Sequence, residues 1–88
     1  MNMTPEQCRA GRVLVGMSQA ELAKRSRRGL STVQDFELER RTTVSADAIT
    51  DMQAVLIKSG VEFIHQTKQK GPGVRLTQPV VRQVTMDI

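Results

Sequence analysis

Several residue types that support common chemistries are scarce in this 88-residue chain: it has one cysteine, one histidine, two phenylalanines and neither tryptophan nor tyrosine. A single cysteine, Cys8, excludes an internal disulfide and a cysteine-rich zinc site, so we expect a reducing, cytoplasmic location. With so few aromatic side chains, the core must consist of Leu, Val, Ile, Met and Ala. Long apolar runs are also missing, and none approaches the ~20 residues that span a bilayer, so we expect no membrane partner.

Sequence motifs of common enzymes are missing as well. The chain has no HExxH, CxxC, GxGxxG or GxxxxGK motif, each of which positions a metal, a redox pair or a phosphate group. His65 lies at the end of a strand-like stretch, where we expect it to be solvated, and Cys8 is expected to be a small buried apolar group on a helix. We therefore predict a protein that is not an enzyme, with no catalytic residue, no metal and no cofactor.

The charge is positive overall, with a formal net charge of +4, and it is unevenly distributed. Residues 1–41 carry eight Lys and Arg against five Asp and Glu, and residues 68–88 carry four against one. Residues 42–67 carry one Lys against three acidic residues. A uniformly solvated surface does not require this split, which places basic groups around the second and third predicted helices and in the tail.

Capping residues and apolar spacing predict four helices. They extend over residues 4–15, 18–26, 30–40 and 46–58. The first helix begins with a capping box of Thr4 and Gln7 that has Pro5 at its first position, and Ser18 with Glu21 is a second capping box. The residues expected to face inward are Cys8, Gly11, Leu14, Val15, Leu22, Ala23, Val33, Phe36, Ala48, Ile49, Met52, Val55 and Leu56.

The pattern changes period after the fourth helix. Residues 61–65 and 74–76 predict two short strands joined by a polar loop, and residues 80–88 alternate weakly. A lone two-stranded hairpin is barely stable in water, so it must pack on the helices, gain a strand from the tail or pair with another subunit. The predicted fold is mainly α: a four- to five-helix domain over residues 4–60, followed by a C-terminal strand or hairpin extension over residues 61–88.

Two short helices joined by a tight turn, over about residues 18–38, predict a helix-turn-helix unit that recognises DNA. Ala23 is small enough to let the two helices approach, and Val33 anchors the second of them to the core. The start of that helix is slim and polar, as entry into the major groove requires, and this edge comprises Leu30, Ser31, Thr32, Gln34 and Asp35. Basic residues bracket the same helix where the duplex strands would pass, so phosphate contacts are expected of Arg27, Arg28, Arg40 and Arg41.

At these residues the chain resembles the Cro/C1-type helix-turn-helix family of small bacterial and phage regulators. The matching stretches are Ser18-Gln19-Ala20-Glu21-Leu22-Ala23 and Ser31-Thr32-Val33-Gln34-Asp35-Phe36-Glu37. The likeness extends over about residues 4–76 and includes Gly60-Val61-Glu62-Phe63 and Gly71-Pro72-Gly73-Val74-Arg75-Leu76. The chain departs from the family pattern at Arg27, where Gly is usual, at Arg28 and Gly29, and at Glu39, where Gly is frequent.

The resemblance implies roles for individual residues. The early positions of the third helix read bases in the family, which implies base reading by Leu30, Ser31, Gln34 and Asp35. The start of the second helix binds the DNA backbone, which implies phosphate contacts by Ser18 and Gln19, with Thr32 as a further contact. In several family members an Arg on the first helix bonds a Glu late in the third, which implies a structural ion pair between Arg12 and Glu37.

The start of the third helix and the turn before it each have two possible forms. The helix is capped at Gly29 or Leu30, or else Ser31 with Gln34 forms its capping box. Because the usual Gly is replaced, Arg27 either adopts a left-handed conformation that costs ~1–2 kcal/mol, or the turn is reshaped around Gly29.

Together these features predict a transcriptional regulator, a repressor or autoregulator, that binds an inverted-repeat operator in double-stranded DNA as a homodimer. RNA polymerase or a partner regulator would be its further partner. Dimer contacts are expected from the fourth helix and the strands, because their apolar residues exceed what a small core needs to bury; these are Ile49, Met52, Val61 and Phe63. The alternative is an antitoxin or adaptor whose tail, residues 77–88, binds a partner protein.

Overall fold

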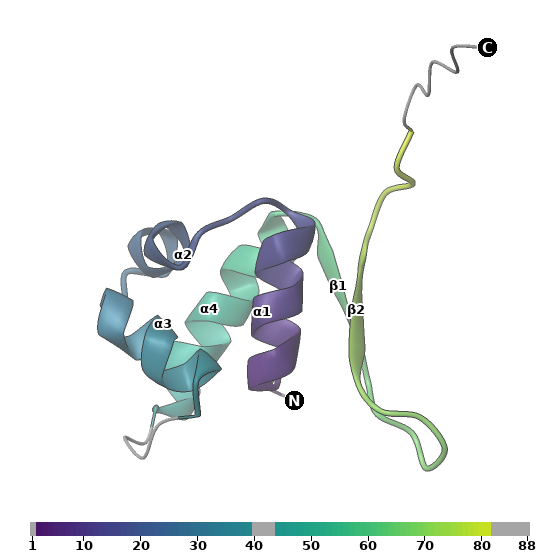
Figure 1. The fold of residues 1–88 in the computed structure, drawn as a ribbon, viewed down its shortest axis with the longest axis horizontal. Coiled ribbons are helices and arrows are strands. Elements are labelled where there is room, and N and C mark those ends of the chain that lie inside the picture. The colour runs from purple at the N-terminus through teal and green to yellow at the C-terminus, as the bar shows by residue number, and fades with distance from the viewer. Residues whose placement is uncertain (1, 40–43, 82–88) are drawn as a thin grey trace, which may run out of the picture.

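Four helices and an antiparallel hairpin make up the part of the chain that the computed structural model describes, residues 2–39 and 44–81 (Figure 1). The elements are α1 (Pro5–Leu14), α2 (Gln19–Ser26), α3 (Leu30–Glu37), α4 (Ala46–Lys58), β1 (Val61–Ile64) and β2 (Gly73–Leu76). The prediction of a mainly α chain with a short C-terminal hairpin is confirmed. None of the helices in these two ranges is long and apolar enough to cross a bilayer.

The first two helices begin at their predicted capping residues. Thr4 and Gln7 form the capping box of α1: Thr4 Oγ1 accepts from the Gln7 N–H at 3.1 Å, and Gln7 Oε1 accepts from the Thr4 N–H at 2.8 Å. At α2, Ser18 Oγ accepts from the Glu21 N–H at 3.0 Å. The Glu21 carboxylate accepts instead from Arg25 Nε, one turn further along, at 2.9 Å. Both starts are thereby fixed by local hydrogen bonds.

The third helix is shorter than the sequence predicts. Gly29 is its N-cap, without a side-chain hydrogen bond, so the alternative start with a capping box at Ser31 is wrong. It ends at Glu37 rather than at residue 40. Glu39 adopts a φ of 51°, a left-handed conformation through which a right-handed helix cannot continue.

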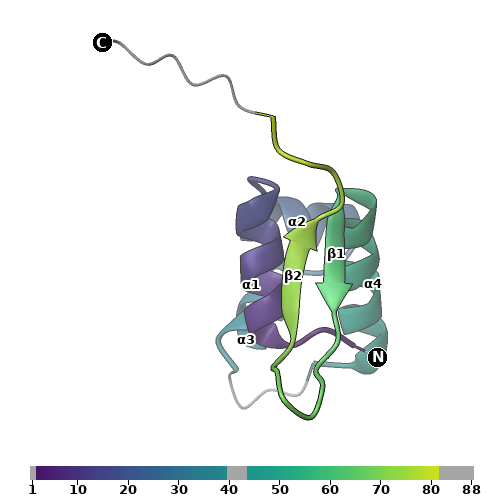
Figure 2. The same cartoon turned by 90° about the vertical axis from the view of Figure 1, so that its right-hand side faces the viewer.

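The core lies where the hairpin, α1 and α4 meet, and α2 and α3 close it on the other side. Figure 2 shows the hairpin lying across α1 and α4, with α2 and α3 behind them. The buried apolar residues are Met3, Cys8, Met17, Leu22, Ala23, Val33, Phe36, Ala48, Met52, Leu56 and Val61. As the composition requires, this core is aliphatic and sulfur-containing, with one aromatic ring among the buried residues.

One prediction about the core is wrong, and the reason given for the predicted dimer contact does not hold for all of its residues. Leu14 is predicted to face inward, yet it is 40% exposed, because α1 ends there and Met17, after the turn, enters the core instead. The apolar residues expected at a dimer contact belong to this chain's own core: Met52 and Val61 are buried, and Ile49 and Phe63 pack against them. Met52 and Val61 therefore offer no surface to a second subunit, whereas Ile49 and Phe63 keep part of theirs exposed.

The hairpin is attached to the helices through a buried glutamine. β1 and β2 pair from Val61 opposite Leu76 to Ile64 opposite Gly73. Gln7, on α1, is 3% exposed, and its Nε2 donates to the carbonyls of Ile64 at 3.3 Å and Gly73 at 2.9 Å. The same side chain therefore caps α1 and satisfies two carbonyls at the far end of the hairpin.

The chain leaves the body of the molecule after β2. The Thr77 N–H donates to the Gly60 carbonyl at 2.9 Å. Residues 78–81 are exposed and form no strand, and the remainder of the predicted stretch over 80–88 lies outside the described residues. His65, directly after β1, is exposed as predicted.

Gly11 lies where α1 packs against Val61 of the hairpin and supplies a test of this packing. A Cβ at Gly11 would lie 3.4 Å from Val61 Cγ1 and 3.5 Å from Leu56 Cδ1, so a branched side chain would overfill the site. We expect Gly11→Val to lower the free energy of unfolding by ~1–3 kcal/mol, although valine favours a helix slightly more than glycine does. Ala10→Val, on the exposed neighbouring position, should cost less than ~1 kcal/mol. Urea denaturation followed by circular dichroism measures both; equal losses would contradict the packing described.

Candidate nucleic-acid interface

Glu37 is a carboxylate buried at the end of α3, with 1% of its surface exposed. Its Oε1 accepts from Arg12 Nη2 at 2.7 Å and from Gln19 Nε2 at 3.0 Å. Its Oε2 accepts from Arg12 Nε at 2.6 Å and from the Cys8 thiol at 3.1 Å. Because Cys8 and Arg12 lie on α1 and Gln19 begins α2, one carboxylate connects three helices. The structure thus brings Arg12 and Glu37 together.

Arginines of α1 make further contacts around this carboxylate. Arg12 Nη1 donates to the Met17 carbonyl at 3.0 Å, just before α2. Arg9 Nη1 donates to the backbone carbonyl of Glu37 at the end of α3. Within the described residues, no buried side-chain nitrogen or oxygen lacks a hydrogen-bond partner. Both the side chain and the backbone of the last residue of α3 are therefore fixed to α1.

The network shifts the pKa values of its members. Burial by itself raises the pKa of Glu37, but the hydrogen bonds from Arg12, Cys8 and Gln19 outweigh burial, so this pKa lies below its usual value. Hydrogen bonding to Glu37 raises the pKa of Arg12. Burial, followed by the hydrogen bond to Glu37, raises the pKa of the Cys8 thiol. Cys8 is therefore an unreactive thiol that serves as a hydrogen-bond donor.

The turn between α2 and α3 contains a left-handed arginine. Arg27 has φ 58° and ψ 37°, whereas Gly29 is extended with φ −71°. The Arg27 N–H donates to the Lys24 carbonyl at 3.2 Å, and the Arg28 N–H donates to the Ala23 carbonyl at 2.9 Å. These two bonds form a Schellman motif, which normally has glycine at the left-handed position. Of the two forms left open by the sequence, the strained arginine is the one adopted.

One face of α3 is fixed to the core and the other is open. Val33 is fully buried and Phe36 is 9% exposed. The predicted base-reading residues lie on the remaining surface of the helix. Leu30 is 43% exposed, Ser31 is exposed, and Gln34, Asp35 and the predicted phosphate contact Thr32 are half-buried. Because Gly29 provides no capping side chain, the start of α3 is left slim.

The residues predicted to bind phosphates differ in whether an acidic side chain of the protein already binds them. Arg28 donates to Asp51 of α4 through Nη2 at 2.6 Å and Nε at 3.1 Å, which neutralises much of its charge. Arg27 is exposed and has no acidic partner in the described part of the chain, and the same holds for Lys24. Ser18 is exposed at the start of α2. Arg40 and Arg41 lie outside the described residues.

Three side-chain contacts around this surface have no signal in the sequence. Gln19, predicted to bind a phosphate, donates to Glu37, so its amide is oriented by the buried carboxylate. Cys8 belongs to the same network. Asp51 holds Arg28. No local motif predicts these contacts, because the donor and acceptor of each are 18 to 29 residues apart in the sequence.

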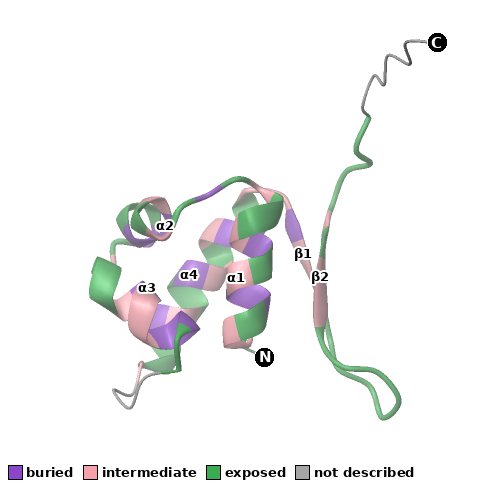
Figure 3. Cartoon of the chain, viewed as in Figure 1, coloured by how far each residue is buried: buried purple, intermediate pink, exposed green. Residues whose placement is uncertain are grey.

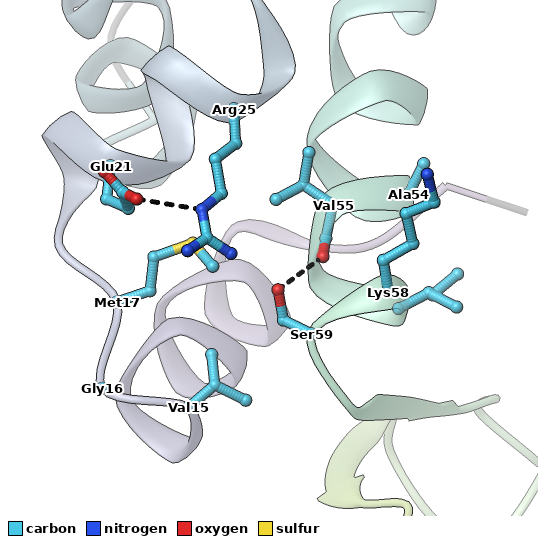
Figure 4. Close-up of a pocket in the computed structure, with 10 residues that line it drawn as sticks. Val15, Gly16, Met17, Glu21, Arg25, Ala54, Val55, Lys58 and Ser59 are labelled. Carbon is cyan, nitrogen blue, oxygen red and sulfur yellow. Dashed lines mark hydrogen bonds and ion pairs between the residues drawn. The ribbon is translucent and has the colours of Figure 1, made fainter.

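A second surface feature is an open groove of about 900 Å³ between the end of α1, α2 and the end of α4. Figure 4 shows Met17 and Val15 on one side of it and Val55 on the other, with the Glu21–Arg25 pair at its edge. No group of histidine, cysteine or acidic residues that could hold a metal occurs within residues 2–39 and 44–81. The groove therefore offers mainly apolar packing, with charged groups at its rim.

Comparison with other proteins gives no family assignment: no protein-family model matches the chain, and no curated protein matches it either.

The lowered pKa of Glu37 predicts an acid-sensitive fold. A carboxylate whose pKa is lower in the folded state stabilises the protein above its unfolded pKa, ~4.3, and this contribution is lost as the pH falls through the folded pKa. We expect Glu37→Gln to cost ~3 kcal/mol at neutral pH, because it leaves Arg12 without its charged partner, and to flatten the loss of stability at acid pH. Urea titrations from about pH 3 to about pH 7 measure both effects. Glu39→Gln is the exposed control, and parallel pH profiles for wild type and Glu37→Gln would contradict the prediction.

The left-handed arginine predicts a substitution that stabilises the fold. Arg27→Gly removes the steric cost of the left-handed conformation, and after the greater flexibility of glycine in the unfolded chain is subtracted we expect a gain of about 1 kcal/mol. Arg25→Gly, two residues earlier inside α2, should instead cost about 1 kcal/mol. Thermal and urea unfolding measure whether each variant gains or loses free energy of unfolding. A loss of stability in both variants would mean that Arg27 is not strained.

Proposed function

We propose that this protein is a sequence-specific DNA-binding transcriptional regulator that inserts α3 into the major groove and acts as a homodimer on an inverted repeat. In this proposal α2, the turn and α3 form a helix-turn-helix unit. The resemblance of residues 18–23 and 31–37 to the Cro/C1-type family supports the assignment. The function takes place in the cytoplasm, without a cofactor and without catalysis.

The observation that carries the proposal is the two-sided character of α3. Its inner face is held by Val33, Phe36 and the bonds to Glu37, so the helix is rigidly positioned. Its outer edge, beginning at Leu30, is open and has short or slender side chains. Reading bases requires this combination, because contacts to base edges depend on a side chain that is accessible but accurately placed.

The side chains on the outer edge of α3 match the chemistry of base edges. The Gln34 amide can both donate and accept, as an adenine edge requires, and the Asp35 carboxylate can accept from a cytosine amino group. Leu30 can contact a thymine methyl group. Ser31 supplies a hydroxyl that suits either a base or the backbone.

Backbone contacts would hold α3 in register. The N-terminus of α2, with Ser18 and Gln19, attracts a phosphate through its free N–H groups and its dipole. Arg27, which has no acidic partner among the described residues, supplies a positive charge beside α3, and Arg40 and Arg41 follow the helix in the sequence. Arg28 contributes less, because Asp51 already binds it. Each phosphate neutralised should add about 0.9 to the slope of log affinity against log salt.

Repression follows from the geometry of such a complex, since a dimer that covers adjacent half-sites blocks access to the same DNA by RNA polymerase. Two copies of α3 related by a twofold axis would read half-sites about one helical turn apart. Regulation would then depend on protein concentration or on a partner regulator.

A second candidate function is an antitoxin or adaptor that binds a partner protein through its tail. The observation in its favour is that Val80 and Val81 are 54% and 92% exposed, although both are apolar. Truncation before Thr77 distinguishes the two functions, because a DNA-binding regulator keeps its affinity for a half-site whereas an adaptor loses its partner.

Footprinting on the DNA that surrounds the protein's own gene tests the main proposal. We expect an inverted repeat to be protected, and Gln34→Ala to bind that site with ~1–3 kcal/mol less free energy while its affinity for random DNA is unchanged. Arg40→Ala should weaken both kinds of DNA about equally and flatten the salt dependence.

The control for these variants is Gln69→Ala, an exposed glutamine in the hairpin loop, away from α3. It should leave both affinities unchanged. Equal loss on the protected site and on random DNA would mean that Gln34 does not read bases. Absence of protection at low salt would reject the DNA-binding function itself.

A further inference from the structure

An apolar groove runs along α1 beside β2. It consists of two adjoining hollows of about 520 and 400 Å³, and Ala10 and Val74 line both. Val13 and Leu14 line the larger hollow, near the end of α1, and are 73% and 40% exposed. Figure 3 shows exposed segments alternating with buried ones along α1. The exposed valine and leucine are unexplained by the core of the single chain.

The edge of β2 that borders this groove has no partner strand among the described residues. The sheet has two strands, so β2 pairs with β1 on one side only. Alternate N–H and C=O groups of β2, those of Val74 and Leu76, therefore point away from β1. Figure 2 shows β2 on the α1 side of the hairpin and β1 on the α4 side. An open strand edge next to an apolar groove is a template for one more strand.

The end of the chain has the sequence that such a strand needs. We call residues 79–88 the arm. Its apolar residues at 80, 84, 86 and 88 share one side of an extended chain, so one face could cover the groove while the other meets water. Fully extended, residues 80–88 would span roughly 30 Å, whereas α1, with 10 residues, is about 15 Å long. The arm is therefore long enough to cover the whole groove.

We propose that the arm of one copy adds to β2 of a second copy as an antiparallel third strand, and that its apolar face covers Ala10, Val13 and Leu14 there. This inference rests on the homodimer of the proposed function and names the surface that forms it. Backbone hydrogen bonds to the edge of β2 supply affinity, and the apolar side chains in the groove fix the register.

The direction of the chain after β2 favours a second copy over the arm's own groove. Thr77 is bonded to Gly60, and residues 77–81 continue away from α1 rather than turning back along β2 (Figures 1 and 2). A twofold axis close to Thr77 would bring each arm to the other copy's groove. Such an exchange is self-complementary and closes at two subunits.

Sedimentation equilibrium without DNA tests the exchange. We expect the full chain to be a dimer, and truncation after Gln78 to weaken dimerisation by about 30-fold or more. Val13→Lys should have the same effect, because it places a charge in the groove. Ile57→Lys is the matched control: Ile57 is also an exposed apolar residue on a helix, 53% exposed, but it lines the groove of Figure 4. It should change dimerisation by less than about threefold.

Each other outcome overturns the inference. A full chain that is monomeric at every concentration, or a dimer that survives both truncation and Val13→Lys, rejects it. A monomer whose stability falls on truncation would mean that the arm covers its own groove. Dimer loss in Ile57→Lys alone would move the interface to the other groove. Val84→Glu with Met86→Glu repeats the test within the arm, and a dimer that survives this double substitution also rejects the inference.

DNA binding is measured separately, on a duplex with a single half-site. Variants that lose the dimer should keep their half-site affinity if both proposals hold. A dimer that binds no DNA would reject the proposed function while leaving the arm exchange intact. A monomer that binds half-sites would reject the arm exchange, and the homodimer with it, while leaving DNA binding by α3 intact.

Discussion

The buried ion pair of Arg12 with Glu37 is the interaction on which the arrangement of the helices depends. A lone carboxylate in this position would cost several kcal/mol of lost hydration. Two bonds from Arg12, one from Gln19 and one from Cys8 replace that hydration. Since these donors come from α1 and from the start of α2, the end of α3 has one position in which all of them are satisfied. The pair thus contributes specificity of arrangement more than net stability.

Rigidity on one side of α3 is accompanied by strain at both ends. Arg27 before it and Glu39 after it adopt left-handed conformations, with φ 58° and 51°, that glycine would adopt more easily. The packing of Val33 and Phe36 and the bonds of Glu37 hold the helix in spite of that cost. The first turn of α3 carries no capping side chain. The proposed DNA recognition depends on the outer edge of this short helix.

Much of the fold could be predicted because its signals are local. Capping residues such as Thr4 and Ser18 bond to backbone groups three positions away. The start of each of these helices can therefore be predicted from a short stretch of sequence. The burial of Val33 and Phe36 follows from helical spacing. The outward position of Leu14 could not be predicted in this way, because helical spacing marks a face of α1 but does not tell which neighbours cover it. The end of α3 at Glu37 was missed because a glutamate at position 39 does not by itself indicate a left-handed residue, although the family pattern frequently has Gly there.

The sequence by itself determined which segments are helices and strands, the aliphatic nature of the core and the residue types available for a nucleic-acid surface. Tertiary structure alone decided how those residues are used: that Gln7 satisfies the carbonyls of the hairpin, that Gln19 and Cys8 bind Glu37, and that Asp51 takes up the charge of Arg28. The physical reason is distance along the chain. Hydrogen bonds between residues far apart in sequence exist only after the core has brought their helices together, and no periodicity or short motif encodes them.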